Sequence, residues 1–312
     1  MEVRVETAWN SIFDVKMPKL VIGTINIQYG GNVRIQTAAR CLKQMNVDLA
    51  LLTETKIVNE LYTRGAEGYT ITATKAKSIH QGGVALVHRS HSDNFAVEGT
   101  RAFGPNVIRT ILVSGRKAWT VIGAYIPPSE TDGSTLNAIR AARDSASAKR
   151  PVIMMGDLNV DLADIKEGMG AERRQETAAL VTTLGLEDLR RHFKLRQKNR
   201  EGFTWRSTMD PSIRSRCDYI LTDSVSDFSR YRILTPRYIE SDHKVVKALL
   251  NLDTVERHKR YYRHRTKRPQ LNLKPADKTQ ADKILEELEK EIKNLQRRIC
   301  DNSPGFRRRL GN

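Results

Sequence analysis

Polar side chains that could do chemistry stand at the ends of apolar runs in this sequence: Asn26, Glu54, Tyr125, Asp157, Asn159, Asp218, Asp242 and His243. Carboxylate and amide oxygens can hold a hard divalent cation such as Mg²⁺, which takes a few such ligands and keeps several waters. A histidine held by a carboxylate can move protons or stay charged beside an anion. Asn and Asp after a strand are also common turn formers and helix caps, so each residue alone carries little weight. Their repeated position is the informative feature.

Short buried runs and amphipathic stretches alternate around these residues. Apolar runs and two-residue alternation predict strands at 20–26, 48–53, 69–74, 84–88, 107–113, 119–126, 151–155, 203–207, 217–221, 231–234 and 245–250. Helical spacing predicts helices at 35–45, 136–148 and 172–184. Strands outnumber helices, so the pattern predicts an α/β (α+β) sandwich of sheets flanked by helices. Strand ends form one rim of such a domain and hold side chains rigidly.

The polar residues lie in motifs that follow one another in a familiar order: Ile25-Asn26, Thr53-Glu54-Thr55-Lys56, Tyr125-Ile126-Pro127, Gly156-Asp157-Leu158-Asn159, Arg216-Cys217-Asp218-Tyr219 and Ser241-Asp242-His243. In order and spacing these motifs resemble the endonuclease/exonuclease/phosphatase superfamily, over about residues 19–252. Each motif alone is weak, whereas the ordered set is strong. The resemblance implies a DNase I-like fold, which is a four-layered α/β sandwich of two packed mixed sheets flanked by helices. It also implies an active site at one edge of the sheets.

The resemblance further implies a metal site and a group that handles the attacking water. Glu54 would be a direct ligand of Mg²⁺, for which Mn²⁺ could substitute, with Asn26 and Asp242 close by. Asp157 would orient or deprotonate the water that attacks a phosphodiester. These roles agree with what the hydrolysis requires, because the water must be placed in line and charge on the oxygens must be stabilised.

The remaining motif residues would act on the phosphate. Asn159 and Tyr125 would donate hydrogen bonds to it. Asp218 would hold His243 as imidazolium, or in one tautomer, facing the scissile phosphate. The sequence leaves open which side chain is the general base, because it does not show protonation states.

Two triplets narrow the branch of the superfamily. Glu54-Thr55-Lys56 and Phe203-Thr204-Trp205 resemble abasic-site nucleases of the exonuclease III type and endonucleases of non-LTR retrotransposons. Repair enzymes usually carry a Trp-Asn-x-Asp-Gly run, whereas this chain has Thr24-Ile25-Asn26-Ile27-Gln28. The departure favours a Mg²⁺-dependent, retrotransposon-type endonuclease that nicks a DNA target. The alternatives are an abasic-site repair endonuclease, a phosphatase or RNA phosphodiesterase of the same superfamily, and a non-catalytic nucleic-acid-binding module. Trp205 is expected in the core, with stacking near DNA as the alternative.

The composition indicates a polyanionic partner inside the cell. The chain has 53 Lys+Arg against 36 Asp+Glu, a net charge of +17 and a pI near 9.9, which favours nucleic acid. The widely spaced Cys41, Cys217 and Cys300 indicate neither a disulfide framework nor a zinc site. No apolar stretch approaches the roughly 18 residues of a membrane span. The first residues lack the apolar core of a secretory signal. We therefore expect an intracellular, nuclear protein with no membrane partner.

The chain divides into four predicted segments: an N-terminal extension at 1–18, the endonuclease/exonuclease/phosphatase domain at 19–252, a basic linker at 253–275 and a helical tail with a short heptad pattern at 276–312. Residues 257–268 carry seven Lys/Arg with two Tyr interleaved, a composition that could bind DNA or RNA, or form a solvated linker. The heptad segment could mediate self-association or pack on a missing domain. The sequence has no polymerase motif, so a retrotransposon-type protein would either continue into a reverse transcriptase region or be a stand-alone relative.

Overall fold

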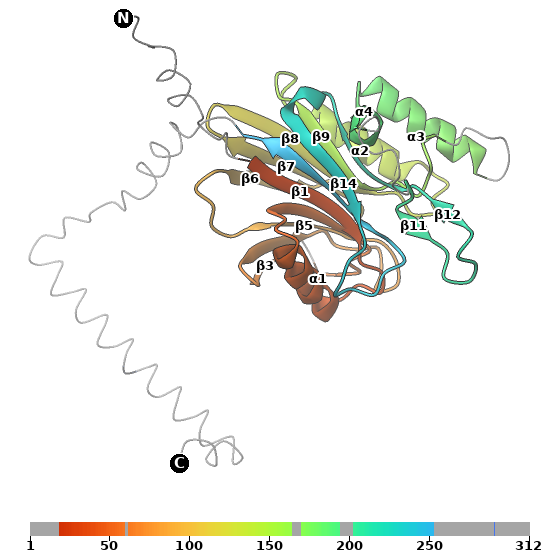
Figure 1. Cartoon of the computed structure of the whole chain (residues 1–312), viewed down its shortest axis with the longest axis horizontal. Helices are drawn as coiled ribbons and strands as arrows, with labels where there is room; N and C mark the ends of the chain where they lie inside the picture. Colours follow the sequence, from red (N-terminus) through yellow and green to blue (C-terminus); the bar gives the residue numbers. More distant parts are fainter. Residues whose placement is uncertain (1–18, 60–61, 164–169, 194–201, 253–289, 291–312) are drawn as a thin grey trace, which may run out of the picture. The chain divides into compact units, whose positions relative to one another are not determined.

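Two sheets form the centre of the protein, whose computed structural model describes residues 19–59, 62–163, 170–193, 202–252 and 290. Apart from Lys290, the described residues lie in one compact unit (Figure 1). The first sheet contains, in spatial order, β14 (Phe228–Leu234), β15 (Val245–Asn251), β1 (Lys19–Asn26), β2 (Leu49–Thr53), β5 (Val84–Arg89), β4 (Tyr69–Ala73) and β3 (Tyr62–Ala66). The second contains β10 (Glu187–Asp188), β13 (Asp218–Thr222), β9 (Val152–Asp157), β8 (Lys117–Tyr125), β7 (Val107–Ser114) and β6 (Ala96–Ala102).

Both sheets are mixed, because β1 runs parallel to β2 and β8 runs parallel to β9 while the other pairs are antiparallel. A separate hairpin joins β11 (Trp205–Arg206) to β12 (Arg214–Ser215). The helices are α1 (Asn32–Gln44), α2 (Ser134–Asp144), α3 (Ala171–Thr183) and the short α4 (Leu189–Phe193), with a 3-10 turn η2 (Val225–Asp227).

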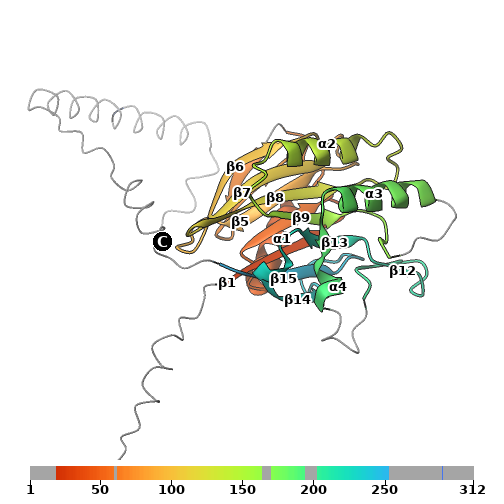
Figure 2. The same ribbon diagram turned by 90° about the horizontal axis from the view of Figure 1, so that it is seen from above.

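The elements stack as four layers. One apolar cluster, which includes Ile22, Leu51 and Met155, lies between the two sheets. A second cluster packs α1 on the outer face of the first sheet, through residues such as Ile35 and Leu42 that recur at helical spacing. A third packs α2 and α3 on the outer face of the second sheet, where Figure 2 shows the two helices along the sheet. The predicted four-layered α/β sandwich of two mixed sheets is therefore confirmed.

Strand alternation brings the polar strand ends together between the sheets. Successive side chains of a strand point to opposite faces, so residues two apart share a face. Met155 and Ile220 belong to the cluster between the sheets, and two positions along the same faces lie Asp157 and Asp218. Ile22 faces the same cluster, and four positions further along β1 lies Asn26. Polar side chains thus terminate an apolar layer whose interior positions are hydrophobic.

The sequence missed some strands and misplaced one tryptophan. No strand was predicted at β3 or β6, and both are edge strands with exposed residues, so they lack the clear apolar alternation of the inner strands. The predicted strand at 203–207 is only the two residues of β11. Trp205 is partly exposed, because it lies on that small hairpin rather than in either sheet.

The predicted segments at 1–18, 253–275 and 276–312 lie outside the described residues, except for Lys290. Their predicted roles as extension, basic linker and helical tail stay predictions. Among the described residues, no helix is long and apolar enough to cross a membrane.

Candidate active site

Asn26 joins the two sheets within the site. It ends β1, is fully buried, and donates through Nδ2 to Glu54 Oε1 at 2.8 Å and to Asp157 Oδ2 at 2.9 Å. Its Oδ1 accepts a hydrogen bond from the backbone N–H of Gln28 at 2.9 Å. The Asn26 amide nitrogen therefore bridges two carboxylates, that of Glu54 directly after β2 in the first sheet and that of Asp157 at the end of β9 in the second. The amide oxygen already accepts one backbone hydrogen bond.

Glu54 occupies an unusual backbone position directly after β2. Its φ is 58°, a region that non-glycine residues rarely adopt. The backbone N–H of Thr55 donates a hydrogen bond to the carbonyl of Gly83 at 3.1 Å, which holds the chain directly after Glu54. The carboxylate accepts a hydrogen bond from the Tyr125 hydroxyl at 3.1 Å and lies 3.4 Å from Lys56 Nζ. Burial and the Glu54 charge raise the pKa of Tyr125, so Tyr125 stays a phenol and a hydrogen-bond donor.

Asp157 is the last residue of β9. It is fully buried, lies directly opposite Asp218 on β13 and adjoins Tyr125 on β8. Gly156 precedes it with a φ of 144°, and a Cβ there would overlap the carbonyl of Ala124. Burial and the Asp218 charge raise the pKa of Asp157 to about 7, against the opposing effect of His243. The position is thus that of a carboxylate that can take a proton near neutral pH.

Asn159 is held by hydrogen bonds on every side. Its backbone N–H donates to Asp157 Oδ1 at 2.9 Å, and its Nδ2 donates to the carbonyl of Ile126 at 2.9 Å. Its own carbonyl accepts from Arg173 Nη2 at 2.9 Å. The φ of Asn159 is 51°, a conformation that costs energy and persists only where the surroundings fix it. Arg173, on the first turn of α3, also donates to the carbonyls of Pro127 and Pro128.

His243 and Asp218 form a buried pair. His243 Nδ1 lies 2.8 Å from Asp218 Oδ2, and the two side chains are 6% and 0% exposed. The backbone N–H of Asp218 donates to Thr204 Oγ1, and that of His243 donates to Ser241 Oγ, each at 3.0 Å. Burial lowers the pKa of His243, but the Asp218 charge and hydrogen bond outweigh burial and raise that pKa to about 10. His243 is therefore an imidazolium at neutral pH, with Nε2 directed 4.0 Å from Asp157 Oδ2.

Asp242 lies on the open side of the imidazole. Its Oδ2 accepts a hydrogen bond from Trp205 Nε1 at 2.8 Å, and its Oδ1 lies 3.6 Å from His243 Nε2. The backbone N–H of Asp242 donates to Gln28 Oε1 at 3.5 Å. Trp205 thus orients a site carboxylate, and Gln28, the residue that departs from the repair pattern, lies within the site.

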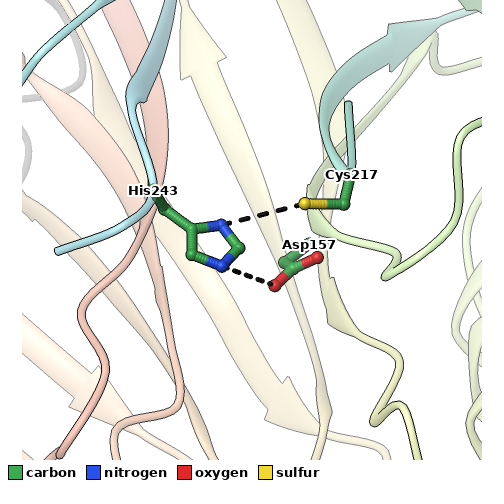
Figure 3. Close-up of side chains that lie close together, drawn as sticks. All are labelled: Asp157, Cys217 and His243. Atoms are coloured by element: carbon green, nitrogen blue, oxygen red, sulfur yellow. Dashed lines mark hydrogen bonds and ion pairs between the residues drawn. The ribbon is translucent and has the colours of Figure 1, made fainter. Parts of the chain in front are cut away.

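The chemistry of Glu54 and Asp242 suits a divalent cation. The side chains of Glu54 and Asp242 are 22% and 11% exposed, and Asp242 Oδ1 accepts no hydrogen bond from the described residues. Hard cations prefer such carboxylate oxygens with retained waters. Asn26 lies beside Glu54 but directs its amide nitrogen, not its oxygen, at the carboxylates. A separate, buried group of potential ligands consists of Asp157, Cys217 and His243, with ligand atoms within 4.8 Å of one another (Figure 3).

The structure brings together every residue that the sequence singled out, through direct contacts or one intermediate residue. Sequence reasoning missed Arg173, Cys217 and Thr204 as neighbours of the site. Arg173 lies on α3, 14 positions after Asn159 in the sequence. The helical pattern does not indicate which charged residue of the helix contacts a loop. Cys217 lies inside the Arg-Cys-Asp-Tyr motif, so its position next to Asp218 was the available signal.

The fold and the sequence pattern of the chain are those of a family of enzymes that cleave phosphoesters. The chain belongs to the Endonuclease/Exonuclease/phosphatase family, whose pattern matches residues 23–243. The resemblance noted from the motifs is thereby confirmed. No curated protein matches the chain in sequence.

Solved structures share the fold at low sequence identity. The AP endonuclease LMAP from Leishmania major matches with a TM-score of 0.60 and 17% identity, over 81% of this chain and 92% of that one. The endonuclease domain of TRAS1, a telomere-specific non-LTR retrotransposon, matches with a TM-score of 0.57 and 16% identity, over 76% of this chain and 100% of that one. An AP endonuclease from Archaeoglobus fulgidus matches with a TM-score of 0.55 and 17% identity, over 75% of this chain and 100% of that one. At these identities the likeness establishes the DNase I-like fold alone.

Proposed function

We propose that the domain hydrolyses phosphodiester bonds of DNA with the help of Mg²⁺, for which Mn²⁺ can substitute. The observation that carries the proposal is the continuous network from Glu54 through Asn26 to Asp157 and on to His243 and Asp218. It places a partly exposed carboxylate, a buried carboxylate and an imidazolium along one rim. Metal-assisted hydrolysis of a phosphodiester uses a cation site, a group that handles the attacking water and a hydrogen-bond donor to the phosphate.

Each side chain has a distinct task in this mechanism. Asp157 orients the attacking water and takes its proton, because its raised pKa matches a base near neutral pH. The imidazolium of His243 faces the phosphate and stabilises its negative charge, while Asp218 keeps the ring charged and fixed. Tyr125 and Asn159 add hydrogen bonds from neutral donors.

The cation would be held by Glu54 and Asp242, with Asn26 positioning Glu54. When bound, it supplies positive charge that offsets charge developing on the phosphate and the leaving oxygen. The ammonium group of Lys56, 3.4 Å from the Glu54 carboxylate, would partly balance the negative charge of Glu54 and Asp242 before the cation binds.

DNA is the proposed substrate because the chain is strongly basic and its structural neighbours are named as AP endonucleases and as the endonuclease domain of a telomere-specific retrotransposon. The segment from 253 onward holds 17 basic and 9 acidic residues, so about half of the excess charge of +17 belongs to the family domain and the residues before it. Gln28 in place of an acidic residue supports a retrotransposon-type enzyme that nicks a target. The TRAS1 domain among the structural neighbours supports that role, and an enzyme with that role would act in the nucleus.

Nicking of supercoiled plasmid tests the proposal. We expect conversion to open circles with Mg²⁺, none with EDTA, and none with Asp157→Ala or His243→Ala protein. Asp93→Asn is the matched control, since Asp93 is an exposed acidic residue in the loop after β5. Nicking that persists in the Asp157→Ala protein would overturn the mechanism.

A second candidate is abasic-site repair, favoured by the two AP endonucleases among the neighbours. An oligonucleotide duplex with one abasic site, beside an intact duplex of the same sequence, separates the two functions. Preferential incision at the abasic site would decide for repair. Equal or sequence-selective nicking of intact DNA would decide for the retrotransposon-type enzyme, and turnover of only RNA or small phosphoesters would exclude both.

A further inference from the structure

The thiol of Cys217 lies against the far side of the catalytic imidazole. Its Sγ is 3.9 Å from His243 Nδ1 and 3.5 Å from Asp218 Oδ2, and those two atoms are 2.8 Å apart. Figure 3 shows the sulfur directed at one ring nitrogen and Asp157 at the other. The residue is 5% exposed, so its sulfur is enclosed with these groups rather than turned to solvent.

These separations match those of ligands around one zinc ion. Zinc takes thiolate at about 2.3 Å, imidazole at about 2.0–2.1 Å and carboxylate at about 2.0–2.2 Å. Ligand atoms of a tetrahedral site then lie about 3.3 to 3.8 Å from one another. The Cys217, His243 and Asp218 atoms form a triangle close to this size: the sulfur–oxygen edge of 3.5 Å lies within the range, the sulfur–nitrogen edge of 3.9 Å must shorten slightly, and the hydrogen-bonded His243–Asp218 edge of 2.8 Å must lengthen.

The donor set selects for a thiophilic ion rather than for Mg²⁺. Sulfur and imidazole are soft or borderline ligands that favour zinc and its congeners, whereas Mg²⁺ prefers oxygen. The Asp157 carboxylate, within 4.8 Å of both the Cys217 and the His243 ligand atoms, or a water, can complete four ligands. Asp218 Oδ1 accepts no hydrogen bond from the described residues, so its carboxylate can turn toward an ion.

We infer that Cys217, His243 and Asp218 form a second, inhibitory metal site for zinc or another thiophilic ion, behind the catalytic imidazole. Binding displaces two protons to solvent, one from the thiol and one from His243 Nδ1, and forms sulfur–metal, nitrogen–metal and oxygen–metal bonds. The imidazolium charge is lost and the ring moves away from Asp218. If Asp157 is the fourth ligand, the base is occupied as well.

Metal binding can be measured apart from activity. In the full-length Cys41→Ala/Cys300→Ser protein, Cys217 is the sole thiol. Titration with Cd²⁺ should give the ultraviolet charge-transfer absorption of a cadmium–thiolate bond, saturating at one ion per chain. The further substitution Cys217→Val should abolish that absorption, and Cys217→Ser provides a second variant that preserves side-chain size. The same absorption in either Cys217 variant, or no absorption in the Cys41→Ala/Cys300→Ser parent, would overturn the site.

The inhibitory effect rests on the proposed nuclease function and is measured separately. At fixed, saturating Mg²⁺, micromolar Zn²⁺ should reduce plasmid nicking by the wild-type protein at least tenfold. The rate of the Cys217→Val protein, normalised to its own zinc-free rate, should stay within about twofold. Equal inhibition of both proteins would refute the inhibitory role. Failure of nicking without zinc would instead count against the proposed function, and the Cd²⁺ titration would still decide the metal site.

Discussion

The site has two corners that differ in their access to water. The cation corner, which is the part of the site proposed to hold the metal, comprises Glu54 and Asp242, whose side chains are 22% and 11% exposed. The proton corner comprises Asp157, Asp218 and His243, of which both carboxylates are 0% exposed. In the proton corner pKa values move far from their ordinary values, because burial removes the water that would otherwise stabilise charge. A cation that keeps several waters needs the opposite environment.

Asn26 is the side chain that touches both corners, with one nitrogen bonded to a carboxylate of each. The difference between the two corners shows that one rim of the sheets can hold partly exposed and fully buried carboxylates side by side. Variants should therefore divide into those that added metal rescues and those that it does not. The predictions below test that division.

Asp157→Asn should produce the largest effect, a loss of nicking on the order of 10³-fold or more that extra Mg²⁺ does not restore. The amide keeps the shape but takes no proton from water. The measurement is the initial rate of plasmid nicking across a Mg²⁺ series. Recovery of the rate at high Mg²⁺ would show that Asp157 helps to bind the cation, and the division into two corners would then be wrong.

The same variant should be more stable than the wild type in metal-free buffer. The folded-state pKa of about 7 lies above the ordinary value of 3.8, so the folded protein binds this proton more tightly. Stability contributed by the protonated carboxyl is lost as pH rises through that window. We expect Asp157→Asn to raise the free energy of unfolding by about 1–2 kcal/mol at pH 8 and by less at pH 5. Urea unfolding at both pH values checks the sign.

Asp218→Asn should lower activity on the order of 10²-fold at neutral pH and shift the alkaline limb of the rate profile. The charge and hydrogen bond of Asp218 are the largest of the effects that raise the pKa of His243 to about 10 against burial, with smaller contributions from Asp157 and Asp242. Without that charge, the imidazolium loses its proton at lower pH, so the rate falls earlier as pH rises. In the wild type, the raised pKa contributes stability below pH 6.5 that is lost as pH approaches 10. An unshifted alkaline limb would show that His243 does not act as imidazolium.

Much of this site was visible in the sequence, because strand periodicity fixes which residues share a face. Asn26 and Asp157 end runs of buried apolar residues and Asp218 begins one, and that pattern is local. What could not be predicted is which partners meet across the two sheets, since register between distant strands has no local signature. The short hairpin carrying Trp205 was read as a full strand, although its isolated bridge to His243 places it in the site.

Glu54→Gln should raise the Mg²⁺ concentration for half-maximal nicking by roughly 10- to 100-fold, with the rate largely restored at high Mg²⁺. Glu54 lies in the open corner, so solvent and added cation can compensate for a weakened ligand. Glu176→Gln, an exposed residue of α3, is the matched control. Unchanged Mg²⁺ dependence in Glu54→Gln protein would remove Glu54 from the proposed cation site.

Arg173→Lys should give the smallest effect, a decrease in kcat of about tenfold with DNA affinity and its salt dependence unchanged. The lysine keeps the positive charge but loses the planar fork that binds the carbonyls of Asn159, Pro127 and Pro128. Asn159, at its unfavourable φ, would then relax away from the phosphate while the charge seen by DNA stays the same. Arg140→Lys, an exposed residue of α2, controls for surface charge. A change in KM without a change in kcat would instead indicate that Arg173 contacts DNA and does not act by holding Asn159.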